Sequence, residues 1–455
     1  MFRAGLLGAV LAGWLAGCGG SAGESLPETG VSPDNDDPAA TPAEDLVARS
    51  DVRGLDRLYA YRQDSPYATV LRQCALIESS DDACSLDTLP FISQATPDFT
   101  REDIMHRVLV THDWMGRHFE SVLDDAPEGM ITLFGALTSI VIGSTVRPSN
   151  YWTGTGGIQL DPGNLWLTID EKANVSIQQD YRNDFGRDLQ FWDIGTLREG
   201  NSPAIRYFSL TDRQERTLKD IRIPMYRLLY HELAHAVDYL PAASIATLDI
   251  TMTPTDALFQ NREFFLSPQL ANELPLYSQT LYDLALVSFG GEQASELQTG
   301  LTPAYVGGEM AIDGAVRYYA YSTWREDFAT LFATTLMKLE FNLDYYLAFV
   351  QKPQNEQHYS CSELTVGWGV KNRVADPLVS PRARWVLESV YGSTPGFDAF
   401  FATRLGTASP MITGVDWCTN RDGVRLTTGA RARIDGAPDV DDRIQLEGER
   451  RQVVH

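Results

Sequence analysis

Five consecutive residues, His231-Glu232-Leu233-Ala234-His235, have the types and spacing of a metal-dependent hydrolytic centre. On a helix, the two histidines lie one turn apart on the same face, so both imidazoles can bind one zinc ion. Glu232 lies about 100° around the helix from His231, beside the metal rather than on it. There its carboxylate can take a proton from a metal-bound water. The alternative is an ordinary polar helix face.

The residues around this motif predict the helix that must carry it. Apolar residues recur there at helical spacing, namely Leu229, Leu233, Ala236, Val237 and Leu240. Pro224 suits the first position of a helix, and Pro241 ends the segment because the residue before a proline is pushed out of the helical conformation. Asp238 returns to the face of His231, and we expect it to accept a hydrogen bond from a ligand histidine. It could instead bind the metal or be a solvated carboxylate.

The motif supplies two of the three protein ligands that a catalytic zinc site needs, so a third ligand must come from elsewhere in the chain. Metzincins place glycine seven residues and histidine or aspartate ten residues after the first histidine, and here those positions hold Asp238 and Pro241. A distant carboxylate is the remaining common solution, and Glu326 is the best candidate. It stands in the first turn of a second expected helix, whose apolar residues are Trp324, Phe328, Leu331, Phe332 and Leu339.

Glu326 also has a simpler interpretation. Thr323-x-x-Glu326 is a capping box, in which the glutamate only satisfies a backbone donor. We favour the ligand, because the metal site otherwise lacks a partner. Glu309, Asp313 and Asp327 are the substitutes if Glu326 only caps the helix.

The two segments together resemble a known family. The motif with Ala236-Val237-Asp238 behind it, followed by Glu326-x-Phe328-Ala329-x-x-Phe332, is similar to the gluzincin metallopeptidases with an anthrax lethal-factor-like catalytic core. The likeness covers two short helices, and the segment between His235 and Glu326 is longer than in the toxin core.

This resemblance implies a role for each residue of the site. The two histidines of the motif and Glu326 would bind Zn²⁺, and Glu232 would be the general base of peptide-bond hydrolysis. A tyrosine upstream of the third ligand would stabilise the oxyanion. By position that tyrosine is Tyr319, with its neighbour Tyr321 as the alternative.

The expected fold is α+β and mainly helical. The resemblance implies a zincin-like core, expected over residues 131–415, in which a small twisted sheet packs on the motif helix. One of its edge strands would pair with an extended peptide. A helical region over 46–130 precedes this core, and a β-hairpin tail over 416–455 follows it. We expect strands at 139–142, 157–160, 165–169 and 205–208, and helices from Phe341 onward and at 381–391.

The N-terminus predicts where the protein works. A short basic start precedes an apolar run, residues 5–16, that is too short to span a bilayer. Leu15-Ala16-Gly17-Cys18 resembles a bacterial lipobox, which implies a signal peptide over 1–17 and lipidation of Cys18. The small, acidic, proline-rich segment 18–45 is typical of a flexible linker. We therefore expect an exported protein anchored to the bacterial cell envelope, at the outer membrane if there is one. The alternative is a plain secretory peptide with an incidental cysteine.

The remaining cysteines agree with export. Cys74, Cys84, Cys361 and Cys418 form an even set, which in an exported protein suggests disulfides. Proximity favours pairing Cys74 with Cys84, which leaves Cys361 with Cys418. No pair has a metal-ligand spacing such as C-x-x-C.

The charge balance limits the partners. The chain carries 37 Lys and Arg against 61 Asp and Glu, a net charge of −24, whereas binding of nucleic acid needs a basic face. We expect a protein or peptide substrate, and a membrane reached through lipidated Cys18. The favoured function is a zinc metalloendopeptidase. The alternative is a non-catalytic zinc-binding envelope lipoprotein that acts as a binding or scaffolding module, and the intact Glu232 favours the enzyme.

Overall fold

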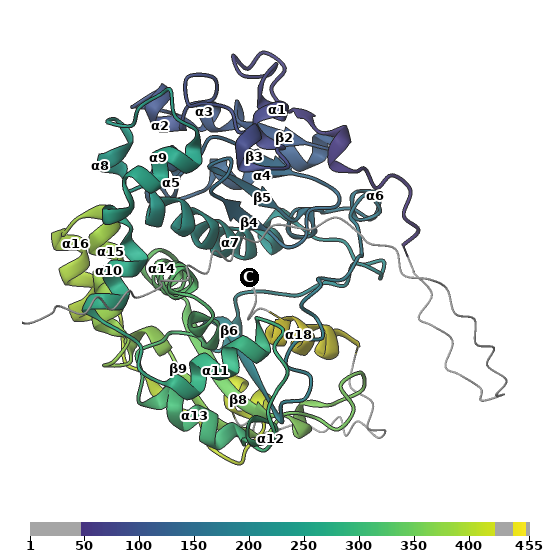
Figure 1. Cartoon of the computed structure of the whole chain (residues 1–455). Helices are drawn as coiled ribbons and strands as arrows, with labels where there is room; N and C mark the ends of the chain where they lie inside the picture. The colour runs from purple at the N-terminus through teal and green to yellow at the C-terminus, as the bar shows by residue number, and fades with distance from the viewer. Residues whose placement is uncertain (1–46, 424–439, 452–455) are drawn as a thin grey trace, which may run out of the picture. The chain divides into compact units, whose positions relative to one another are not determined.

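The computed structural model describes residues 47–423 and 440–451 (Figure 1). Cys18, its lipobox and the linker over 18–45 lie outside the described residues. The described part belongs to one compact unit, Asp45–His455, in which many helices accompany two five-stranded sheets. The expected α+β class is confirmed at this level. None of the described helices combines the length and apolar character that a membrane crossing needs.

The first sheet has the strand order β1-β2-β3-β5-β4. Its three central strands run parallel, while β1 and β4 pair antiparallel at the two edges. All of β3 is buried, as expected for a parallel strand covered on both faces. The strands are β1 (Tyr59–Ala60), β2 (Val108–Val110), β3 (Ile140–Ile142), β4 (Asn150–Trp152) and β5 (Gly157–Leu160).

This sheet tests the expected strands and the expected domain boundary. β3 and β5 confirm the strands expected at 139–142 and 157–160. The region 46–130, expected to be helical, contributes β1 and β2 to the same sheet, so the expected boundary at residue 130 falls inside one structural layer. Its helices are α1 (Leu71–Ala75), α2 (Ile92–Ala95), α3 (Arg101–Met105), α4 (Asp113–Asp124) and α5 (Glu128–Leu133).

Two expected strands are wrong, each for a local reason. In the segment 165–169, Thr168 and Glu171 form a capping box that starts helix α6 (Ile169–Lys172). In the segment 205–208, the backbone bonds to a side chain instead of a neighbouring strand. The Tyr207 N–H donates to Gln445, and the Gln445 amide donates to the carbonyl of Ile205.

The second sheet is antiparallel throughout, with the order β10-β9-β8-β6-β7. The helix expected from Phe341 onward is wrong. Phe341 ends a helix, and Asn342 follows in the left-handed conformation that terminates helices, with φ of 52°. An aromatic and apolar strand then begins. The strands are β6 (Phe191–Glu199), β7 (Ser202–Pro203), β8 (Asp344–Gln351), β9 (Val366–Lys371) and β10 (Ser409–Pro410).

Helices α7 (Leu218–Tyr239) and α14 (Trp324–Phe341) pack against each other. α7 lies along β4 and β5 of the first sheet (Figure 1), and α14 contacts β8 of the second sheet. α7 begins at a capping box of Thr217 and Asp220. Pro224 therefore lies inside the helix and not at its first position, which corrects the expectation. α7 ends just before Pro241, as expected.

The remaining described helices follow in chain order. Between α7 and α14 they are α8 (Ala242–Ile245), α9 (Pro254–Gln260), α10 (Leu266–Glu273), α11 (Gln279–Ser288), α12 (Glu296–Thr299) and α13 (Pro303–Ala311). After β9 they are α15 (Ser380–Tyr391), α16 (Pro395–Ala399), α17 (Trp417–Asp422) and α18 (Val440–Arg451). α15 confirms the helix expected at 381–391.

The described part of the tail is helical, so the expected β-hairpin over 416–455 is wrong there. Asp416 caps α17 by accepting a hydrogen bond from the Thr419 N–H, at 2.9 Å. Glu449 on α18 accepts a 2.7 Å bond from the buried Trp417 indole and pairs with Arg421. These contacts favour packed helices over strands. The segment 425–436, from which the hairpin was expected, lies outside the described residues.

Both expected disulfides are present. Cys74 and Cys84 are bonded, with their Cα atoms 5.3 Å apart. Cys361 and Cys418 are bonded at a Cα separation of 6.0 Å, which ties the start of α17 to the segment before β9.

Candidate metal centre

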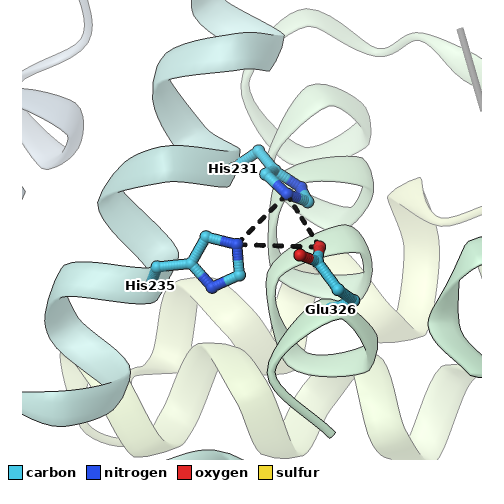
Figure 2. A group of neighbouring side chains, drawn as sticks. All are labelled: His231, His235 and Glu326. Carbon is cyan, nitrogen blue, oxygen red and sulfur yellow. Dashed lines mark hydrogen bonds and ion pairs between the residues drawn. The ribbon is translucent and has the colours of Figure 1, made fainter. Parts of the chain in front are cut away.

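Two histidines of α7 and a glutamate of α14 meet at one point (Figure 2). The Nε2 atoms of His231 and His235 are 3.3 Å apart. Glu326 Oε2 lies 3.0 Å from His231 Nε2 and 3.6 Å from His235 Nε2. The structure thus brings together the three residues that the sequence analysis selected as ligands, across 90 residues of intervening chain between Glu326 and its nearest partner.

The spacing of these three atoms fits a zinc ion. Ligand bonds of about 2.0–2.1 Å in a tetrahedral site place neighbouring ligand atoms about 3.3 Å apart. The observed separations of 3.0, 3.3 and 3.6 Å lie around that value. Glu326 Oε2 is buried, and no conventional hydrogen bond to it is found among the described residues. A buried oxygen of this kind, facing two imidazole nitrogens, is suited to a cation.

The electrostatics of the three residues show how strongly they are coupled. Burial lowers the pKa of His231 to about 4. Burial acts in the same direction on His235, but the nearby charges of Glu326 and Glu232 outweigh it and raise the pKa of His235 to about 9. Burial opposes the charged form of Glu326, yet both histidines together hold its pKa well below the usual range. In the absence of a cation, one proton on His235 therefore compensates the carboxylate.

The backbone of Glu326 takes part in helix capping, whereas its side chain belongs to the metal centre. The Glu326 N–H donates to the Thr323 hydroxyl at 3.1 Å. The reciprocal bond from the Thr323 backbone to the Glu326 carboxylate, which completes a capping box, is not formed. The carboxylate is directed at the histidines instead (Figure 2).

Glu232 lies beside the three ligand atoms and is almost fully buried, at 3 % exposure. Burial raises its pKa to about 7, while His235 and a hydrogen bond from the Tyr151 backbone act to lower it. Tyr151 belongs to β4, the antiparallel edge strand of the first sheet. The edge of that sheet therefore borders the carboxylate that the motif assigns as the base.

Of the two candidate tyrosines, only Tyr319 faces the centre. Burial raises its pKa well above the usual range, and the negative charges of Glu326 and Glu232 add to this. Tyr321 instead donates a 2.9 Å hydrogen bond to Asp313, so its assignment to the oxyanion is wrong. Both belong to one short 3₁₀ helix, residues 318–321. With three residues per turn, positions 319 and 321 point in different directions.

Asp238 does not support a ligand histidine, contrary to expectation. It is fully buried, and its Oδ1 accepts a 2.6 Å hydrogen bond from the Ser267 N–H in the first turn of α10. Its other oxygen has no hydrogen-bond partner among the described residues. Asp238 therefore ties α10 to α7.

The three substitute ligands are all engaged elsewhere. Glu309 accepts a 2.6 Å hydrogen bond from the Ser278 hydroxyl. Asp313 accepts bonds from the Tyr277 and Ser278 backbones and from Tyr321. Asp327 forms a buried bidentate ion pair with Arg382. None of them belongs to the cluster at the histidines.

Three arginines near the centre were not found from the sequence. Arg182 is close enough for its charge to lower the pKa of Glu232 and of Tyr319. Arg317 acts in the same way on His231. Arg227 precedes His231 by one helical turn, and this spacing was the one available signal. The loop that carries Arg182 shows no pattern that would place it here.

Other groups with ligand-type side chains do not form a second centre. The cluster of Cys361, Asp416 and Cys418 contains a disulfide, so its sulfurs are already bonded to each other. His118 bonds to Glu171 at 2.9 Å, and His112 lines a surface cavity of about 540 Å³ together with Arg53 and Tyr59. Neither histidine joins a set of three ligands in the part of the chain that the structure describes.

The arrangement can hold one divalent cation through two imidazoles and a carboxylate, with a second carboxyl group and a phenol beside it. Comparisons of the chain with protein-family models, with curated proteins and with solved structures found no match.

Proposed function

We propose that this protein is a zinc-dependent metallopeptidase of the gluzincin type. The supporting observation is the set of three ligand atoms, 3.0–3.6 Å apart, on two packed helices. Structural zinc sites are usually closed by four protein ligands, mostly cysteines, whereas two histidines and a glutamate with an open fourth position are typical of catalytic zinc. The buried Glu232 beside this set favours catalysis further.

The residues of the chain divide the chemistry among them. His231, His235 and Glu326 would hold the metal, which supplies Lewis acidity and lowers the pKa of water. Glu232 accepts a proton from the attacking water and returns it to the leaving amine. Tyr319 keeps its proton, because its pKa is raised well above the usual range, and so it donates a hydrogen bond to the oxyanion of the tetrahedral intermediate.

The neighbouring sheet offers a place for an extended substrate. Among the described strands, β4 stands at the edge of its sheet beside β5, and its Tyr151 borders Glu232. An extended peptide can add to such an edge through backbone hydrogen bonds. A peptide bound along β4 would pass the general base, which favours peptides as substrates.

The proposed place of action is outside the cytoplasm. Two disulfides fit an oxidising compartment. Together with the lipobox-like sequence at Cys18, they support an exported lipoprotein of the bacterial cell envelope that acts on proteins or peptides there.

Metal analysis and a peptide library test this function. The purified protein should contain one zinc per chain, and His231→Ala should remove it. Glu232→Gln should keep zinc but lose hydrolysis of the library peptides. If wild type and Glu232→Gln bind zinc and are equally inert, the enzyme proposal is wrong, and a non-catalytic zinc-binding envelope protein is the better description.

A further inference from the structure

Arg325, next to the metal ligand Glu326, has no acidic partner among the described residues. It stands in the first turn of α14, and its side chain is partly exposed. Its Nε is buried without a hydrogen-bond partner, and no ion pair to its guanidinium group is found in the described part of the chain. The guanidinium group of arginine stays charged in proteins, so it can bind a carboxylate that a ligand brings.

Arg325 is held over the end of helix α7 without using its N–H donors. Its guanidinium carbon lies 4.7 Å from the centre of the Tyr239 ring, a cation–π contact. Tyr239 is the last residue of α7, where the helix dipole also favours a cation. Burial raises the pKa of Tyr239 to about 12, while the charge of Arg325 and a hydrogen bond from it act to lower this pKa. Arginine has five N–H donors, so a bond to one hydroxyl leaves others available.

Tyr239 connects Arg325 to the metal centre. It follows His235 by four residues, so the two side chains are neighbours on one face of α7. The charge of Glu326 reaches the Tyr239 hydroxyl and acts to raise its pKa. The centre is accessible on this side, because the side chains of His235 and Glu326 are 12 % and 19 % exposed. The part of the centre that solvent reaches therefore adjoins Tyr239 and Arg325.

The proposed path of the peptide leads to the same place. Tyr151 on β4 stacks on Tyr239, with ring centres 5.9 Å apart and an angle of 29° between the rings. The Tyr151 backbone also borders Glu232. A peptide that adds to β4 would be extended, and alternate side chains of an extended peptide point the same way. One of these side chains is thereby expected beside Tyr239 and Arg325.

The ring contact alone does not explain why Arg325 lacks a carboxylate. Arg384 also lies 4.7 Å from the centre of an aromatic ring, that of Phe401, and it pairs with two acidic side chains. Burial raises the pKa of Asp238 and the charge of Arg325 acts against this, yet the carboxylate of Asp238 accepts its hydrogen bond from Ser267 and forms no ion pair with Arg325. Acceptors for the N–H donors of Arg325 are thus left to a ligand.

We propose that Arg325 binds a carboxylate of the substrate and thereby makes acidic peptides the preferred substrates of this centre. This inference rests on the proposed function and deepens it, because it names the substrate class. The planar fork of the guanidinium group matches the two oxygens of a carboxylate. That carboxylate belongs to an Asp or Glu side chain close to the scissile bond, or to a free C-terminus.

Binding measurements on the zinc-loaded Glu232→Gln variant test this preference without turnover. The reference is a neutral peptide blocked at both ends. The probes carry a single glutamate moved stepwise along the same sequence, and a further probe is the neutral sequence with a free C-terminal carboxylate. At least one carboxylate probe should bind about 10-fold more tightly than the reference. The tightest probe identifies the source of the carboxylate, and a matched series with lysine should bind no more tightly than the reference.

Variants of Arg325 in the same background locate the preference. Arg325→Gln should lower the affinity for the preferred probe to that of the neutral peptide, with zinc content kept at one per chain. Arg325→Lys should retain part of the preference, because lysine keeps the charge and loses the planar fork. The matched control is Arg384→Gln, which removes an arginine with the same ring contact and should leave the preference unchanged.

The outcomes separate this preference from the proposed peptidase function. Equal binding of acidic and neutral peptides, or no binding of either, overturns the role of Arg325 even if the wild type hydrolyses peptides. So does a preference that Arg325→Gln retains, whether that variant is destabilised or not, since Arg325 would then be structural. A preference that survives removal of zinc with a chelator and is lost in Arg325→Gln supports the proposal, even if the wild type cleaves none of the probes.

Discussion

Glu326 and Asp327 are consecutive residues at the start of α14, and their carboxylates have opposite surroundings. Asp327 forms a bidentate ion pair with Arg382, deep in the protein. Glu326 faces two imidazole nitrogens, and its buried Oε2 has no conventional hydrogen-bond partner among the described residues. Asp327 is satisfied by a permanently charged guanidinium group, whereas Glu326 faces two titratable imidazoles, of which His235 carries a proton when no metal is bound.

Whether a carboxylate has hydrogen-bond or ion-pair partners within the chain distinguishes structural from functional carboxylates better than its burial does. Glu309 and Asp313 resemble Asp327, since each accepts hydrogen bonds from neighbouring donors. Buried polar groups are nearly always satisfied, so a convergent group that is not satisfied indicates a ligand. The contrast can be tested by removing each carboxylate in turn.

Removing the structural carboxylate should have the largest effect on folding. Asp327→Ala leaves the guanidinium group of Arg382 buried without its carboxylate partner, and this group cannot lose its charge. We expect the free energy of unfolding to fall by about 3–5 kcal/mol, measured by urea denaturation. The zinc content of the folded fraction should remain one per chain. Loss of zinc at unchanged stability would reverse the assigned roles of the two residues.

Removing the ligand carboxylate should act mainly on the metal. Glu326→Gln should weaken zinc binding by more than about 100-fold, which exceeds the usual cost of losing a supporting residue around a metal, measured by competition with a chelator. The metal-free variant should lose less stability than Asp327→Ala, because His235 can release its proton when the carboxylate is gone. Unchanged zinc affinity would exclude Glu326 as a ligand.

The sequence was informative wherever the chemistry is local. The spacing of His231 and His235 places both on one helical face, and the capping residue Thr323 marks the start of the helix that carries Glu326. The short loop between Cys74 and Cys84 likewise favoured the pairing that the structure contains. These features depend on neighbours within a few residues.

Features set by distant contacts could not be predicted. Ile205–Phe208 has the composition of a strand, but its backbone groups bond to Gln445, more than 200 residues away. Asp238 has the spacing of a residue that supports a ligand, but the packing of α10 against α7 gives its carboxylate the Ser267 N–H as a partner instead of a ligand histidine. Arg182 and Arg317 come from separate segments that only tertiary packing brings to the centre.

The pair Tyr319 and Tyr321 repeats the same contrast with a smaller expected effect. Tyr319→Phe should lower kcat about 10- to 100-fold with KM nearly unchanged, because the hydroxyl acts on the transition state. Tyr321→Phe should leave kcat unchanged and cost about 1 kcal/mol of stability, because it removes a hydrogen bond to Asp313. Kinetics on a cleaved library peptide and urea denaturation check both. Equal losses of kcat would mean that neither hydroxyl contacts the oxyanion directly.

Asp193 gives an effect of another kind, a dependence of stability on pH. Burial raises its pKa in the folded protein to about 7, from 3.8, although Arg317 and Arg450 act to lower it. A carboxyl group with a raised folded pKa contributes stability that is present below its unfolded pKa and is lost as the pH rises through the folded value. The stability of the wild type relative to Asp193→Asn should therefore decline between about pH 4 and pH 7. Urea denaturation of both proteins across this range measures the difference, and parallel profiles would show that Asp193 is ionised throughout, as an ordinary partner of Arg317.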